Sequence, residues 1–235
     1  RQESLESAVD MENMLQYYAV SVIMDNIDWP SHNFLSWKCA ENSSSVYGDG
    51  KVRFFLYDLD AVYQDTSDRE IQNAFEYLMG EPIADATDTL WLLMQSDKYR
   101  TQFVNMVCDL TGTVYDADHV IQVIREEDQK VERSMQMYYT DAELERQQAA
   151  VEEMIQAAAA SCDKIRAGME TYLGTEDPYT LTVTAPEGSG IAFSQIRLPE
   201  GESYSGTYYH NYPLTLVAEL GEEQSFRCWL VNGEE

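Results

Sequence analysis

The sequence has few basic residues. Lys and Arg account for 15 of its 235 residues, against 42 Asp and Glu, which gives a formal net charge of −27. A field of that sign repels the phosphates of nucleic acids and anionic lipid surfaces, so we expect neither as a partner. The chain also lacks an apolar run near the roughly 20 residues that cross a bilayer, and no segment has the pattern of a signal peptide.

Cysteine motifs and glycine-rich phosphate loops are missing as well. The four cysteines, Cys39, Cys108, Cys162 and Cys228, are far apart and form no CxxC pair, which argues against a zinc knuckle or a thioredoxin-type redox site. Their spacing leaves open both one or two disulfides and free buried thiols. Neither GxGxxG nor GxxxxGK(S/T) occurs, so the sequence supplies no glycine-rich loop of these types for a nucleotide.

Apolar and aromatic residues, by contrast, are plentiful. Hydrophobic residues make up 44% of the chain and include 16 Tyr, whereas a disordered acidic chain would be poor in aromatics. Residues 10–27 predict a helix, because side chains such as Leu15 and Tyr18 recur on one face and Asp10 suits the N-cap. Pro30 ends this helix, since proline disfavours helical backbone at the residue before it.

The rest of the chain predicts a hairpin, then helices, then short strands. Runs at residues 34–39 and 51–60 read as two strands of a β-hairpin joined by a polar loop. Helices are predicted at residues 69–78, 86–94, 98–111, 117–138 and 141–173. Gly174 stands where the last helix should stop. From residue 176 onward, short runs between Gly, Pro and Asn, the last of them at 225–233, predict strands. We therefore expect an α+β fold with a mostly helical domain at 1–175 and a small all-β module at 176–235.

Four polar residues around the hairpin could carry chemistry. Asp28 is followed five positions later by Asn33, and the hairpin then leads to Asp58 and Asp60. Phosphoryl transfer needs a carboxylate at the acceptor hydroxyl, and oxygen ligands that hold magnesium against the nucleotide phosphates. Protein kinases place a catalytic Asp five positions before a metal-binding Asn, and a second metal-binding Asp after it. If the run FFLYDLD is a strand, Asp58 and Asp60 share one face and reach the same cation.

These residues also have plainer interpretations. Asp28 suits a turn or cap before the proline, and Asp58 with Asp60 suits the solvated end of a strand. His32 suits a structural role within the loop. Asp25 and Asn26 could cap the helix end or contact the metal, and we expect capping. Trp29 and Trp37 are expected in the core and not as stacking partners of a ligand.

Two sequence motifs carry a family resemblance. The run IDWPSHN, followed by a strand, a loop and VRFFLYDLD, resembles the N-x-D-W-P…N and (W/Y)-D-L-D signatures of the spore-coat protein CotH kinase family. The downstream run SDKYRTQFVNMVCDLTGTVYDADHVIQVI is similar to the segment that follows these signatures in that family. The resemblance covers about residues 10–173.

The resemblance implies an atypical protein kinase of the bacterial cell or spore surface, secreted, that phosphorylates proteins with ATP and Mg²⁺ or Mn²⁺. The mostly helical domain would then be the C-terminal lobe of a kinase-like fold, with the hairpin in its catalytic loop. Asp28 would take the catalytic role, and Asn33, Asp58 and Asp60 would bind the metal and the nucleotide. Whether Asp58 or Asp60 is the primary ligand stays open.

The chain departs from the family pattern at its start. The lysine and glycine-rich elements that hold ATP in the N-terminal half of the family's domain are not found, so we expect this part to be inactive alone. Residues 206–218 resemble small β-repeats found beside secreted bacterial domains, which act as spacers or adhesive units. The alternative function is therefore a non-catalytic cell-surface scaffold or adhesion protein that keeps a kinase-like fold and an acidic metal site. A glycoside hydrolase is disfavoured, because no carboxylate pair stands beside an aromatic sugar platform.

Overall fold

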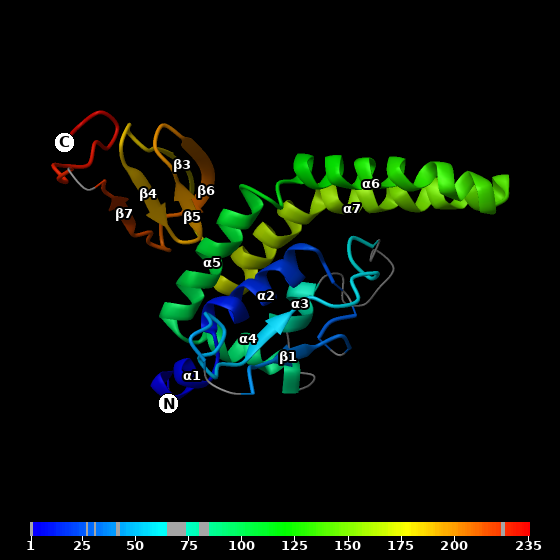
Figure 1. Cartoon of the computed structure of the whole chain (residues 1–235), viewed down its shortest axis with the longest axis horizontal. Helices are drawn as coiled ribbons and strands as arrows, with labels where there is room; N and C mark the ends of the chain where they lie inside the picture. The colour runs from blue at the N-terminus through cyan, green and yellow to red at the C-terminus, as the bar shows by residue number, and fades with distance from the viewer. Residues whose placement is uncertain are drawn as a thin grey trace. The chain divides into compact units, whose positions relative to one another are not determined.

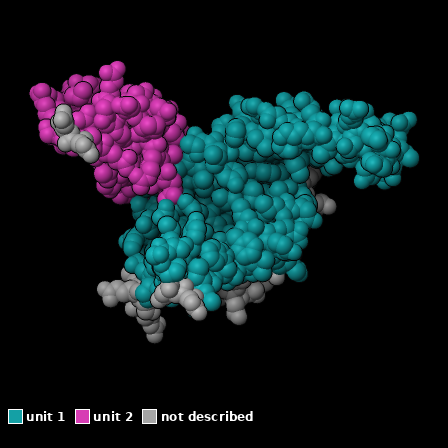
Figure 2. All heavy atoms as spheres, in the orientation of Figure 1, with its two compact units in different colours: residues 1–174 teal, residues 175–235 magenta. Residues whose placement is uncertain are grey.

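The fold is taken from a computed structural model, which describes residues 2–26, 28–30, 32–40, 43–64, 74–79, 85–221 and 224–235. The chain divides into two units, residues 1–174 and residues 175–235 (Figure 2). Each unit has its own hydrophobic core, and each is described by itself.

The first unit is built around a buried helix near its start. Helix α1 spans Gln2–Ala8 and α2 spans Met11–Ile23. The predicted N-cap is confirmed, since the Asp10 side chain accepts a hydrogen bond from the Asn13 backbone N–H at 3.1 Å. The helix ends earlier than residue 27, because Asp25 has a left-handed backbone with φ of 51°. Tyr18 is fully buried, so α2 is a central element of the core.

The remaining helices of this unit lie close to the predicted ranges. They are α3 (Ala74–Met79), α4 (Asp85–Met94), α5 (Asp97–Thr111), α6 (Ala117–Tyr138) and α7 (Asp141–Leu173). Residues 69–73 of the helix predicted at 69–78 lie outside the described residues. Gly174 ends α7 in the left-handed conformation, with φ of 65°, as expected of a helix C-terminus.

Helix α2 packs against α3, α5 and α7, and the core lies between them (Figure 1). Phe75 of α3 stacks on Phe103 of α5, with ring centroids 6.1 Å apart, and meets Tyr172 of α7 edge-on. Helices α6 and α7 run side by side as a long helical hairpin (Figure 1). At its base, a second cluster packs α6 and α7 around Met24 and Tyr63. The long hairpin is thus anchored beside the end of α2.

The predicted β-hairpin is present, but its strands are short. Strand β1 (Leu35–Trp37) pairs antiparallel with β2 (Arg53–Phe55). The prediction that the second strand carries Asp58 and Asp60 on one face is wrong, because β2 ends at Phe55. Asp58 has a φ of 54°, which breaks the extended backbone that strand alternation requires.

The second unit contains strands in two small sheets. Strand β3 (Pro178–Thr184) pairs with β6 (Ser203–Tyr209), and β4 (Gly190–Phe193) lies between β5 (Ile196–Leu198) and β7 (Leu216–Glu219). Tyr208, Phe193 and Tyr204 form the centre of its core, with ring centroids 5.6 to 6.4 Å apart. The strand predicted at 225–233 is wrong: within the described residues 224–235 the backbone forms an isolated bridge from Val231 to Glu234.

The cysteines settle one open alternative. All four lie within the described part of the chain, and all are free thiols. Cys108 and Cys162 are buried. Burial raises the pKa of the Cys108 thiol to about 12.

Candidate functional site

The register of the β-hairpin determines which loops share one end of it. Leu35 pairs with Phe55, so the chain enters β1 and leaves β2 at the same end of the ribbon. Asn33 lies two residues before Leu35, and Asp58 lies three residues after Phe55. The loop after α2 and the loop after β2 therefore meet at this end. These are the loops that carry the predicted site residues.

A second connection holds the same two loops together at their other ends, away from the β-hairpin. The backbone N–H of Tyr63 donates a hydrogen bond of 2.9 Å to the carbonyl of Met24. Tyr63 follows Asp60 by three residues, and Met24 precedes Asp28 by four. We call residues 24–34 the first loop and residues 56–63 the second loop. Each is thus fixed to the other at both of its ends.

The predicted side chains are accessible from solvent. Asp28, Asp58 and Asp60 are exposed and Asn33 is half-buried. Backbone contacts shape their loops: the Asp28 carbonyl accepts the N–H of His32 at 2.9 Å. Among the described residues, no hydrogen bond or ion pair engages the side chains of these four residues. Carboxylate and amide oxygens without protein partners fit the hard-oxygen ligand set of Mg²⁺ or Mn²⁺.

Left-handed backbone recurs in these loops. Asn33 and Asp58 have φ of 57° and 54°, and Asp25 has 51°. Asn and Asp adopt this region more readily than other non-glycine residues, although it costs of order 1 kcal/mol. Two of the three, Asn33 and Asp58, are residues of the predicted site. The surrounding packing must therefore hold the loops in place.

An aromatic cluster beneath the first loop supplies part of that packing. Trp29 is 1% exposed, and its indole Nε1–H donates to the Tyr17 hydroxyl at 2.7 Å. The Tyr17 ring also contacts Phe34 and Phe54, with centroids 5.8 and 5.6 Å away. Burial raises the pKa of Tyr17 to about 12, so its hydroxyl stays protonated. The core position predicted for Trp29 is therefore confirmed.

Trp37, in contrast, was predicted for the core and is 39% exposed. Its ring lies 6.0 Å from the guanidinium of Arg53, which is itself almost buried. Arg53 pairs with Asp10 at 2.9 Å and with both carboxylate oxygens of Asp49 at 2.9 Å. The Arg53 guanidinium holds the pKa of Asp49 well below its usual range. This network ties the β-hairpin to the start of α2.

A further contact fixes the hairpin along its length. The Asn13 side chain bonds to both backbone groups of Phe54, accepting from its N–H at 2.7 Å and donating to its carbonyl at 3.2 Å. The amide of Asn13 thus extends the hydrogen bonding of β2 onto α2. Sequence reasoning missed Asn13 and Arg53, because each acts through residues distant in the chain.

Asp25 was predicted to cap the end of α2, and this prediction is wrong. Its Oδ1 accepts the backbone N–H of Ala74 at 2.7 Å, and its Oδ2 pairs with Lys164 Nζ at 3.3 Å. Lys164 is 139 residues away in the sequence, and no local pattern marks it. Asn26 is 2% exposed, and its Oδ1 finds no partner among the described residues.

Metal binding by Asn33, Asp58 and Asp60 stays a prediction. Among the described residues, no group of three or more His, Cys, Asp and Glu side chains is arranged to hold a metal ion. The predicted set differs from such a group, because one of its members, Asn33, would contribute an amide oxygen. Within the described helices, none is long and apolar enough to cross a membrane.

Asp28, Asn33 and Asp58 follow one another along the chain, and protein kinases place a catalytic Asp, a metal-binding Asn and a second metal-binding Asp in the same order. A family model described as CotH kinase protein matches residues 2–160, more than half of the chain. The chain therefore belongs to the CotH kinase family. No curated protein and no solved structure matches it.

Proposed function

We propose that this chain carries the catalytic and metal-binding loops of a secreted atypical protein kinase. The reaction would be transfer of the ATP γ-phosphate to Ser or Thr of cell-surface or coat proteins, with Mg²⁺ or Mn²⁺. One observation supports this most strongly. The hairpin register and the Tyr63–Met24 hydrogen bond bring the Asp28 loop together with the Asp58 and Asp60 loop.

The position of each residue suggests its role in the proposed reaction. The exposed Asp28 carboxylate is free to orient the acceptor hydroxyl and to accept its proton, as the bond from the hydroxyl oxygen to the γ-phosphorus forms and the bond from that phosphorus to the leaving ADP breaks. Asn33, Asp58 and Asp60 would hold the metal from the shared end of the hairpin. When bound, the metal supplies positive charge against the β- and γ-phosphate oxygens. The buried Trp29 and Tyr17 keep the first loop rigid, so that these groups need little rearrangement.

Transfer of labelled γ-phosphate from ATP tests the proposal. The assay would use Mn²⁺ or Mg²⁺ with this chain and with an N-terminally extended chain, each beside its Asp28→Asn variant. We expect the substitution to lower metal-dependent transfer about 100-fold or more, while leaving the fold intact. Asp118→Asn, at another exposed carboxylate in α6, is the matched control and should transfer phosphate at the unchanged rate.

The same assay separates the individual roles. Asp58→Asn and Asp60→Asn should each raise the Mn²⁺ concentration needed for transfer, and the larger effect identifies the primary ligand. If the folded extended chain transfers no phosphate, the kinase function is wrong. In that case a non-catalytic scaffold becomes the better reading, and Ca²⁺ binding without any dependence on ATP would support it.

A further inference from the structure

Asp25 is an acidic residue without a role in the proposed reaction, yet it is buried. It is 5% exposed and has a left-handed backbone directly after α2. A carboxylate in such a place is costly unless charge and hydrogen bonds compensate for its lost hydration. Ala74 and Lys164 supply that compensation, through the contacts of 2.7 and 3.3 Å.

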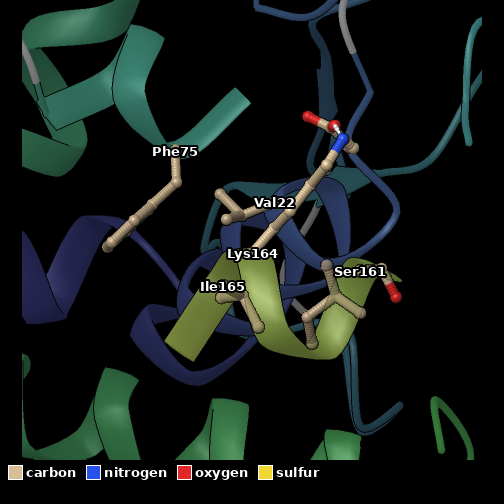
Figure 3. Close-up of a pocket in the computed structure, with 7 residues that line it drawn as sticks. Val22, Phe75, Ser161, Lys164 and Ile165 are labelled. Atoms are coloured by element: carbon tan, nitrogen blue, oxygen red, sulfur yellow. Dashed lines mark hydrogen bonds and ion pairs between the residues drawn. The ribbon is translucent and has the colours of Figure 1, made fainter. Parts of the chain in front are cut away.

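The two partners of Asp25 come from different parts of the first unit. Ala74 is the first residue of α3, which follows the second loop in the chain. Lys164 lies on α7, and its side chain extends away from that helix (Figure 3). Asp25 itself is the second residue of the first loop, three residues before Asp28. One carboxylate therefore connects the first loop, the chain beyond the second loop, and α7.

Met24, the residue before Asp25, also connects the first loop to the second loop and to α7. The Met24 carbonyl accepts the Tyr63 N–H at 2.9 Å. Met24 and Tyr63 are also buried together against Ala158 of α7. The pair Met24-Asp25 is thus the point at which both loops are fixed to α7.

The surroundings of the ion pair favour a positional role over a purely stabilising one. A cavity of about 10 Å³, room for about one water, lies beside it and is lined partly by Ser161, Ile165 and Phe75 (Figure 3). The Lys164 side chain is 37% exposed, so solvent weakens its attraction to the carboxylate. Ion pairs of this kind contribute little net stability, but they penalise arrangements in which the buried charge is unpaired.

We infer that Asp25 and Lys164 are positioning residues, which hold the loop of Asp28 and the loop of Asp60 in the geometry that phosphoryl transfer needs. This inference rests on the proposed function. Asp25 and Lys164 act through the loops, and neither touches the transferred phosphate. Removing the charge of Lys164 would leave the Asp25 carboxylate buried and unpaired, and the first loop would move to hydrate it.

The test compares Lys164→Met, Asp25→Asn and the double variant with wild type, each in the N-terminally extended chain of the phosphate-transfer assay. Asn at position 25 keeps an oxygen for the Ala74 N–H and removes the charge. Arg166→Met is the matched control, because it removes a cation two residues further along α7 whose partner, Asp163, is exposed. Two measurements are made on each folded protein: hydrogen exchange at the amides of Tyr63 and Ala74, and kcat with KM for ATP.

Lys164→Met should speed exchange at both amides and lower kcat about tenfold to 100-fold, with KM for ATP nearly unchanged. The double variant should exchange more slowly than Lys164→Met at both amides and should have a higher kcat than Lys164→Met, since it no longer buries an unpaired charge. Arg166→Met should change neither measurement.

Two results would overturn the inference. Exchange in Lys164→Met that equals exchange in Arg166→Met would show that the ion pair does not hold the loops. Faster exchange with an unchanged kcat per folded molecule would show that it holds them without serving the reaction. If the extended wild type transfers no phosphate, the proposed function fails by itself, and exchange still decides whether Lys164 fixes the loops.

Discussion

Gly168, near the C-terminal end of α7, faces the ring of Phe75 on α3. A Cβ added at this glycine would lie 2.3 Å from Phe75 Cδ1 and 3.0 Å from its Cε1. The ring cannot retreat easily, because Phe75 is 1% exposed and packs between Phe103 and Tyr172. We therefore predict that Gly168→Ala destabilises the first unit, although alanine is the better helix former.

The magnitude follows from two opposing effects. Replacing glycine by alanine inside a helix should stabilise it by about 1 kcal/mol. Overpacking a filled core costs about 1–3 kcal/mol. A contact at 2.3 Å is far inside the roughly 3.5–4.0 Å of favourable carbon contacts, so the upper part of that range applies. The net loss in the free energy of unfolding should be about 1–2 kcal/mol.

Urea unfolding followed by circular dichroism at 222 nm measures this loss. The signal reports the first unit, because the described helices all end at or before Leu173. Phe75→Leu is the partner variant: it shortens the ring that the new methyl group meets. In a double-mutant cycle, Gly168→Ala should cost clearly less in the Phe75→Leu background. A Gly168→Ala protein as stable as wild type, or more stable, would refute the close packing of α3 on α7.

Three further predictions concern other contacts. Tyr17→Phe removes the acceptor of the buried Trp29 Nε1–H and should lower stability by about 1–3 kcal/mol, measured by urea unfolding against the exposed control Tyr138→Phe. At the start of α7, the N–H and hydroxyl of Thr140 donate to the Glu143 carboxylate and lower its pKa. This contact should therefore stabilise α7 fully at pH values above the ordinary pKa of Glu, and its contribution should be lost as the pH falls through the lowered pKa of Glu143. Comparing helicity against pH with Glu143→Gln, which should lack that dependence, checks the sign. Because burial raises the pKa of Cys108 to about 12, iodoacetamide at pH 8 should modify Cys39 and Cys228 in the native protein well before Cys108; equal rates, read by mass spectrometry, would contradict this.

The helices could be predicted from the sequence because their signals are local. Apolar periodicity placed residues 117–138 and 141–173 correctly, and these are the bounds of α6 and α7. Asp10 and Gly174 marked helix ends through their own side chain or backbone preference. The family, too, was recognisable from short runs of sequence, and the match over residues 2–160 confirms it.

The strand after the polar loop was predicted too long, because this prediction also used only the local sequence pattern. The run FFLYDLD alternates as a strand does, and local pattern alone extends it to Asp60. In the structure β2 pairs only as far as Phe55, where its partner β1 begins at Leu35. Beyond that point no strand of the described residues pairs with the backbone to hold it extended, and Asp58 turns into the left-handed region.

The sequence by itself therefore determined most of the helices, the caps at Asp10 and Gly174, the hairpin and the order of the polar residues in the candidate site, since each depends on residues close together in the chain. Helix α1 (Gln2–Ala8) was not predicted. Only the tertiary structure decided which loops meet and what holds them. The contact of Asp25 with Lys164, like that of Gly168 with Phe75, joins residues far apart in the sequence. Such contacts depend on how whole helices pack, and a local pattern does not encode helix packing.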